Sequence, residues 1–160
     1  MAVDMFLKLD GIKGESKQDG HKDEIDIYSW SWGLTQTGSF SMGGGGGSGK
    51  VNVHDITLTK KLDSSSATIT TKCCTGDHIA TGVITCRKAG GTQLEYLKIE
   101  LNDILISSMQ TSGADGSDGV METVSLNFAK FKVTYKEQDA KGQGTNPQVY
   151  GYDVKEGKKL

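Results

Sequence analysis

The stretch LKIELNDILI, residues 97–106, decides the fold class because its apolar side chains alternate and then change phase. They occupy odd positions from Leu97 to Leu101 and even positions at Ile104 and Ile106. Alternation with a period of two is typical of a β-strand with one buried face. A change of phase by one residue sends the following side chains to the other face, so it indicates a bulge, or a strand that turns a corner between two packed sheets.

A second long stretch repeats this behaviour. In VSLNFAKFKVTY, residues 124–135, the apolar side chains are even-numbered from Val124 to Phe128 and odd-numbered from Phe131 to Tyr135. Two strands that both turn a corner predict a closed or nearly closed β-barrel made of two packed sheets.

Shorter segments of the chain also have strand patterns. Residues 3–10 alternate apolar and charged side chains, which predicts a half-buried strand. In residues 25–32, Ile25 and Ile27 are expected on one face and the aromatic residues Tyr28, Trp30 and Trp32 on the other. Two small residues, Ser29 and Ser31, are then expected opposite the aromatic side chains.

One segment favours a helix. Asp63 and residues 64–66, all serine, offer N-cap side chains before residues 67–75, and Gly76 can end a short helix. Elsewhere the chain has one proline, Pro147, so glycines are expected to make the turns, as in Gly90-Gly91. The fold class is therefore mainly β, with one short flanking α-helix.

Composition narrows the possible functions. A chain of 160 residues fits one domain, and a net charge of −2 argues against a dedicated surface for nucleic acid or anionic membrane. Charged residues interrupt the apolar residues at positions 1–10, so no signal peptide is expected, and no stretch is long enough to span a membrane. Three cysteines form no disulfide framework, which indicates synthesis in a reducing compartment.

The glycine run MGGGGGSGK, residues 42–50, falls one residue short of a phosphate-binding loop. Gly44, Gly49 and Lys50 match that pattern, but Val51 replaces the hydroxyl residue that holds Mg²⁺. Residues 51–58 then have a strand pattern, whereas a phosphate loop opens a helix. The alternative function is nevertheless a β-barrel that binds a ligand or nucleotide through this loop and Lys50.

Candidate catalytic and metal-ligating residues are sparse. His54 and Asp55 could form a catalytic triad with Cys73 or Ser31. A triad is defined by its geometry, however, which the sequence does not supply. The better interpretation of His54 is a histidine beside a bulge, with its side chain hydrogen-bonded to the backbone. Cys73, Cys74 and His78 could hold zinc, yet no second ligand pair follows at zinc-finger spacing. We expect no catalytic residues, no metal and no cofactor, and hence no enzyme.

Several segments spread along the chain carry a resemblance to a known family. They are Ala2 to Leu9, Gly14-Glu15-Ser16, Trp30-Ser31-Trp32-Gly33, the glycine run into Lys50-Val51-Asn52-Val53, Arg87 to Gly91, Glu95-Tyr96-Leu97, and Ser125 to Ala129. Together they resemble the haemolysin-coregulated protein (Hcp) family, the tube subunit of type VI secretion, over nearly the whole chain to about Tyr152. The cysteines are not hallmarks of that family, and they leave room for redox cross-linking between subunits.

The resemblance implies a two-sheet β-barrel with one flanking helix, similar to contractile phage tail tubes, in a single domain of residues 1–160 with an extended Gly-rich loop at about 33–50. It implies homohexameric rings that stack into a tube, carry effector proteins, meet a trimeric spike protein and are expelled by a contractile sheath. No nucleic acid and no membrane insertion are expected. The protein would be cytoplasmic before assembly and then secreted without a signal peptide.

Two site hypotheses follow. The face that carries Ser29 and Ser31 is a candidate lining of the tube lumen that contacts cargo. The glycine run is a candidate arm for contacts within or between rings, through Gly43, Gly44, Gly45, Gly46, Gly47 and Lys50. The effectors carried, the polarity of stacking, the oligomeric state in solution and the role of the cysteines stay open.

Overall fold

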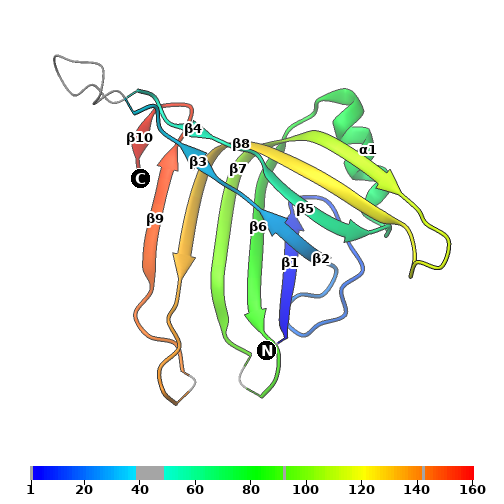
Figure 1. The fold of residues 1–160 in the computed structure, drawn as a ribbon, viewed down its shortest axis with the longest axis horizontal. Helices are drawn as coiled ribbons and strands as arrows, with labels where there is room; N and C mark the ends of the chain where they lie inside the picture. The colour runs from blue at the N-terminus through cyan, green and yellow to red at the C-terminus, as the bar shows by residue number, and fades with distance from the viewer. Residues whose placement is uncertain (1, 39–48, 92, 142) are drawn as a thin grey trace.

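The computed structural model describes residues 2–38, 49–91, 93–141 and 143–160 (Figure 1). Within these residues, one helix and ten strands follow each other. In order they are β1 (Val3–Leu9), β2 (Ile25–Ser31), β3 (Leu34–Thr35), β4 (Asn52–Val53), β5 (Ile56–Lys61), α1 (Ser66–Thr75), β6 (Ile79–Lys88), β7 (Glu95–Ser112), β8 (Met121–Tyr135), β9 (Gln148–Asp153) and β10 (Lys158–Lys159).

The main sheet closes on itself. Its strand order is β10-β9-β8-β5-β2-β1-β6-β7, and β7 also pairs with β8, so the six strands from β8 to β7 form a closed antiparallel barrel. β9 and β10 extend the sheet beyond the barrel at β8. The predicted fold class, a mainly β two-sheet barrel with one short helix, is confirmed.

β7 and β8 belong to both sheets of the barrel. They bend together, so that their two halves run in different directions in Figure 1. Their register is unchanged between the pairs Asn102–Lys130 and Ile104–Phe128. Across the same pairs, the buried residues change from odd to even positions in β7 and from even to odd positions in β8. Asp103, at the bend, has a φ of 53°, in the left-handed region. The predicted corner is therefore confirmed at this place.

The corner divides the barrel into two layers. The first half of β7 and the second half of β8 lie with β9, β6 and β1 in one layer. The second half of β7 and the first half of β8 lie with β5 and β2 in the other, which crosses the first in Figure 1. Among the described residues, nineteen buried side chains form the core cluster between them, and they come from both layers, from α1 and, with Ile12, from the loop after β1.

One prediction about strand faces is confirmed and one is wrong. In β1, Leu7 and Leu9 are buried in the core on the predicted side, although Val3 is 41% exposed and Phe6, on the opposite face, is also buried. In β2, the register shifts between Ile27 and Ser29, so Trp30 packs against the core like Ile27 instead of facing away from it. The bulge places one extra residue in the strand, and this residue brings the even-numbered tryptophan to the core side.

The helix is confirmed, but its N-terminal cap differs from the prediction. α1 ends at Thr75, and Gly76 has a φ of 73° and donates its N–H to the Lys72 carbonyl, as a glycine after a helix does. The N-cap residue, Ser65, makes no side-chain cap bond; its hydroxyl donates to Asp63 Oδ1 at 2.5 Å.

A buried charged cluster lies at the start of α1, and we name it the Lys60 cluster. The Lys60 ammonium, which is fully buried, donates to Glu122 Oε1 at 2.6 Å and to Ser66 Oγ at 3.2 Å, and lies 3.0 Å from Asp63 Oδ1. Ser66 Oγ also donates to Glu122 Oε1 at 2.6 Å. The cluster therefore joins β5, β8 and the first residue of α1.

Candidate assembly surfaces

The outer face of the layer formed by β2, β5 and β8 carries a row of hydroxyl groups. The buried residues of these strands alternate with polar residues that point away from the core. Ser29 and Thr59 hydroxyls lie 2.7 Å apart, and Thr57 and Ser125 hydroxyls lie 3.0 Å apart. We call this surface the hydroxyl face; its members are Ser29, Ser31, Thr57, Thr59, Thr123 and Ser125.

The charged groups at the two ends of the hydroxyl face already have partners. At one end, Asp55 accepts hydrogen bonds from Ser107 Oγ at 2.6 Å and from Asn127 Nδ2 at 2.8 Å. At the other end, Lys61 donates to Asp118 at 3.2 Å, and this hydrogen bond raises the pKa of the Lys61 ammonium. The surface between them can donate and accept hydrogen bonds but carries no formal charge.

The same layer has an unpaired strand edge on each side. β1 pairs with β2 only at residues 25–27, so within the described residues no strand lies beside Ser29–Ser31 on the side away from β5. β6 leaves β7 at Ile104, so the part of the chain that the structure describes offers no strand beside residues 107–112 on the side away from β8. Unpaired edges are templates for pairing with another chain.

A short ribbon of β3 and β4 follows β2 and extends from the barrel (Figure 1). Gly43, Gly44, Gly45, Gly46 and Gly47 lie outside the described residues, while Lys50 is described and exposed. After Lys50 the chain enters β4 and β5 rather than a helix. The interpretation of this loop as a nucleotide site is therefore wrong, because no helix N-terminus follows it to receive a phosphate.

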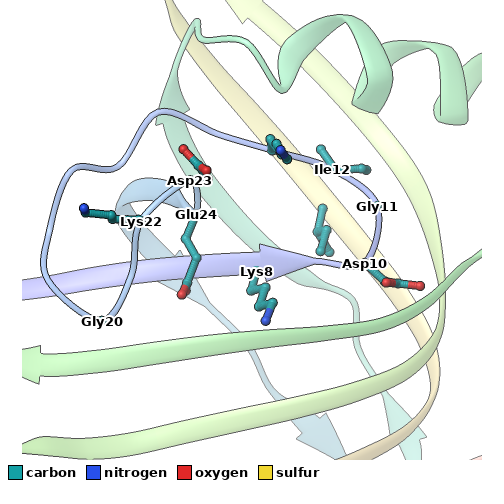
Figure 2. A pocket seen from close by; sticks show the side chains of 10 residues that line it. Lys8, Asp10, Gly11, Ile12, Gly20, Lys22, Asp23 and Glu24 are labelled. Atoms are coloured by element: carbon teal, nitrogen blue, oxygen red, sulfur yellow. The ribbon is translucent and has the colours of Figure 1, made fainter.

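A groove of about 580 Å³ lies between the end of β1 and the loop that follows it. Figure 2 shows the side chains that line it. Its charged lining residues have both signs: Lys8, Lys13 and Lys22 against Asp10, Asp23 and Glu24. Glu24 is already engaged, because His21 Nδ1 lies 2.9 Å from its Oε2. Three lysines and three carboxylates balance in this lining, so the groove does not favour an anionic or a cationic ligand.

The candidate triad and the candidate zinc ligands are not assembled. His54 is exposed, and its backbone bonds to Gly33 and Trp32, whereas Asp55 is held by Ser107 and Asn127. Among the described residues, no group of three or more His, Cys, Asp or Glu side chains is arranged to hold a metal.

The three cysteines lie in different environments. Cys74 is exposed on α1, Cys73 packs against the core, and Cys86 is buried in β6, where burial raises the pKa of its thiol. We expect a thiol reagent to label Cys74 first and Cys86 at least about a hundredfold more slowly, because only an exposed thiolate reacts. Mass spectrometry of the labelled peptides over time measures both rates. Labelling of Cys86 as fast as Cys74 would contradict the buried position.

Sequence inspection missed part of these surfaces. Thr57, Thr59, Thr123 and Ser125 extend the face predicted from Ser29 and Ser31, and their signal is a hydroxyl residue at every second position opposite the apolar phase. Lys60 was also missed, although it follows Ile56 and Leu58 at even positions on the buried side.

A closed barrel with one uncharged polar face and an unpaired edge on each side belongs to the class of self-assembling structural subunits. The chain is a member of the Hcp family of the type VI secretion system, since residues 6–135 match the family model described as "Type VI secretion system effector, Hcp". It is accordingly a subunit of the type VI secretion tube, and the family is secreted by that system.

Individual relatives agree with this assignment. The chain is 51% identical to "Protein hcp1" of Pseudomonas aeruginosa over 98% of both chains. It superimposes on a crystal structure of Hcp1 from Salmonella typhimurium with a TM-score of 0.82 at 33% identity over 100% of both chains. A structure described as a type six secretion system protein gives a TM-score of 0.94 at 26% identity, covering 99% of this chain and 100% of that one.

In the described part of the chain, no helix has both the length and the apolar character needed to cross a membrane.

Proposed function

We propose that this chain closes into a homohexameric ring in which the β2 edge of one copy pairs with the β7 edge of the next. The observation that carries this proposal is the pair of unpaired edges on opposite sides of one four-stranded layer. Pairing between two different edges is heterologous, and such contacts generate rings when the rotation closes. The hydroxyl face then lines the lumen, with four strands from each copy.

The lining suits transport. An uncharged face of hydroxyl groups can form hydrogen bonds with a passing protein but offers no large apolar patch to hold it. The rings stack into a tube that carries effector proteins, meets a trimeric spike and is expelled by a contractile sheath, without a signal peptide. In this role residues 1–160 act as one structural domain without catalysis.

Negative-stain electron microscopy of the purified protein, together with its mass in solution, tests the proposal. A particle with a central hole and the mass of six chains is the expected result. A chain that stays monomeric at every concentration would contradict the ring.

Ser31→Gln tests the lumen assignment. Glutamine is longer than serine and projects into the space that cargo occupies, so we expect effector proteins that co-purify with the ring to fall at least about tenfold, the effect of roughly 1.4 kcal/mol of lost binding. Quantitative mass spectrometry of the purified rings measures them. Thr70→Gln, at an exposed position on α1, is the control. Unchanged retention in intact Ser31→Gln rings would remove Ser31 from the lumen.

The arm assignment for Gly43 to Gly47 and Lys50 also stays a proposal. A connector without side chains can follow a neighbour's strand edge by backbone hydrogen bonds. Shortening the five glycines is expected to reduce tube stacking, seen as shorter tubes by microscopy, while the melting temperature of the subunit is unchanged. An equal loss of stacking and folding would count against an assembly arm.

A further inference from the structure

Residues 13–24 form a strap across the outer side of β1 and β6, between the start of α1 and the start of β7. At the α1 end, the Ser64 N–H donates to Glu15 Oε2 at 2.8 Å. At the other end, the guanidinium of Arg87 donates to the Asp19 carbonyl at 2.9 Å and to Gln18 Oε1 at 3.2 Å. Backbone bonds between Gly14 and Asp23 and between Ser16 and Glu24 hold the two limbs of the strap together.

One histidine closes the strap. His21 is 6% exposed, and its ring is stacked on Phe6 of β1 with a centroid distance of 4.2 Å and an interplanar angle of 5°. Its Nδ1 lies 2.9 Å from Glu24 Oε2, and its Nε2 lies 2.6 Å from Glu95 Oε1. Each ring nitrogen therefore faces a carboxylate oxygen.

This arrangement requires one proton more than a neutral imidazole carries. A neutral imidazole donates from one nitrogen and accepts at the other, whereas an ionised carboxylate can only accept. With a neutral ring, one of the two contacts would bring two lone pairs together. When both nitrogens carry protons, both contacts become charge-assisted hydrogen bonds, which are about twice as strong as neutral ones.

We propose that His21 is a proton-dependent latch: the imidazolium joins Glu24 of the strap to Glu95 of β7, and loss of its proton to solvent releases the strap. The other charged groups around Phe6 are Arg87 of β6, 5.1 Å from the ring centroid, Asp4 of β1, 3.6 Å from Arg87, and Asp26 of β2, which is paired with Phe6 across the two strands. Arg87 and Asp4 form their own pair and Asp26 is an anion, so the imidazolium is the group that balances Glu24 and Glu95.

Release of the strap would affect the β2 edge through which we propose that the ring closes. Gln18, which Arg87 holds, lines a groove of about 300 Å³ together with Asp26, Ile27 and Tyr28 of β2. This groove lies where β2 leaves β1, next to the unpaired edge at Ser29–Ser31. The consequence for assembly rests on the proposed function; the latch itself does not.

Two measurements on the full chain test the latch. The ¹⁵N chemical shifts of the His21 ring identify its protonation state at each pH from about 6 to about 9. Hydrogen exchange of the Gly14, Ser16, Asp23 and Glu24 amides, expressed relative to an unstructured peptide at each pH, reports strap opening. We expect an imidazolium at the lower pH, and protection at least about tenfold lower after deprotonation.

Glu95→Gln separates a latch from a simple structural contact. The glutamine amide can donate to a neutral ring, so this variant is expected to keep the strap protected at high pH, where the wild type loses protection. His78→Gln, outside the strap, is the matched histidine control and should behave like the wild type. A neutral His21 ring at about pH 6, or the same loss of protection in Glu95→Gln and wild type, would overturn the proposal.

The assembly consequence is measured separately, as the fraction of hexamer at the two pH values in wild type and Glu95→Gln. A pH-dependent loss of rings in the wild type alone supports coupling of the latch to the edge. If the hexamer fraction is the same at both pH values while the protection of the strap still changes, the latch acts on the strap alone and its coupling to ring assembly is overturned. No rings at either pH, with the strap still responding, would contradict the proposed function and leave the latch in place.

Discussion

Lys60→Met is expected to lower the free energy of unfolding by about 3–5 kcal/mol, the cost of removing one partner of a buried ion pair. Glu122, which is 2% exposed, would keep its Ser66 hydrogen bond but lose the ammonium 2.6 Å away. Its charge would then be buried without compensation. Chemical denaturation at a fixed protomer concentration measures the change, because oligomerisation would otherwise shift the apparent stability.

Two variants make this test specific to the Lys60 cluster. Lys61→Met removes an ion pair with Asp118, whose side chain is fully exposed, and should cost much less than Lys60→Met, because exposed ion pairs contribute little to stability. Adding Glu122→Met to Lys60→Met removes the uncompensated charge, and we expect the double variant to be more stable than Lys60→Met alone. If Lys60→Met costs no more than Lys61→Met, the buried pair does not hold α1 to the barrel.

Ile69→Ala is expected to cost about 2–5 kcal/mol, as large-to-small changes at fully buried aliphatic positions do. Ile69 is the fully buried apolar residue of α1 and belongs to the core cluster. Its removal leaves a cavity that the surrounding strands fill only partly, and it weakens the packing of α1 on β7.

The neighbouring Thr68 provides the control. It is exposed on α1, and alanine has the higher helix propensity, so Thr68→Ala should leave stability unchanged or raise it by a few tenths of a kcal/mol. Denaturation curves of both variants give the comparison. A loss below about 1 kcal/mol in Ile69→Ala would mean that α1 is not anchored through this side chain.

The sequence predicts the barrel well where its periodicity spans many residues. The change of phase at Asn102–Asp103 and at Ala129–Lys130 was visible because apolar residues flank it on both sides. The bulge after Ile27 could not be located from the sequence. In a strand of seven residues, a bulge that keeps apolar residues on one side gives the same pattern as a regular strand with apolar residues on both sides. Tertiary pairing with β5 decides between these alternatives.

Sites made of residues far apart in the chain were less predictable. His21 and Glu95 are 74 positions apart, and Lys60 and Glu122 are 62 apart, so only the strand pairing brings them together. Phe6 lies on the polar side of a clear alternation, and nothing local shows that the strap covers it. The exposed position of Ser29 and Ser31 was predictable because their pattern is local to one strand, whereas their role in the lumen stays a prediction.

The corner shared by β7 and β8 has a mechanical consequence. Because each strand runs without interruption from one layer into the other, a load on the hydroxyl face passes into the second layer along two covalent backbones. Sheets joined only by side-chain packing can slide past each other under shear, whereas these two layers can separate only if β7 and β8 themselves straighten. A subunit built in this way can be pushed from one end without one layer being stripped from the other.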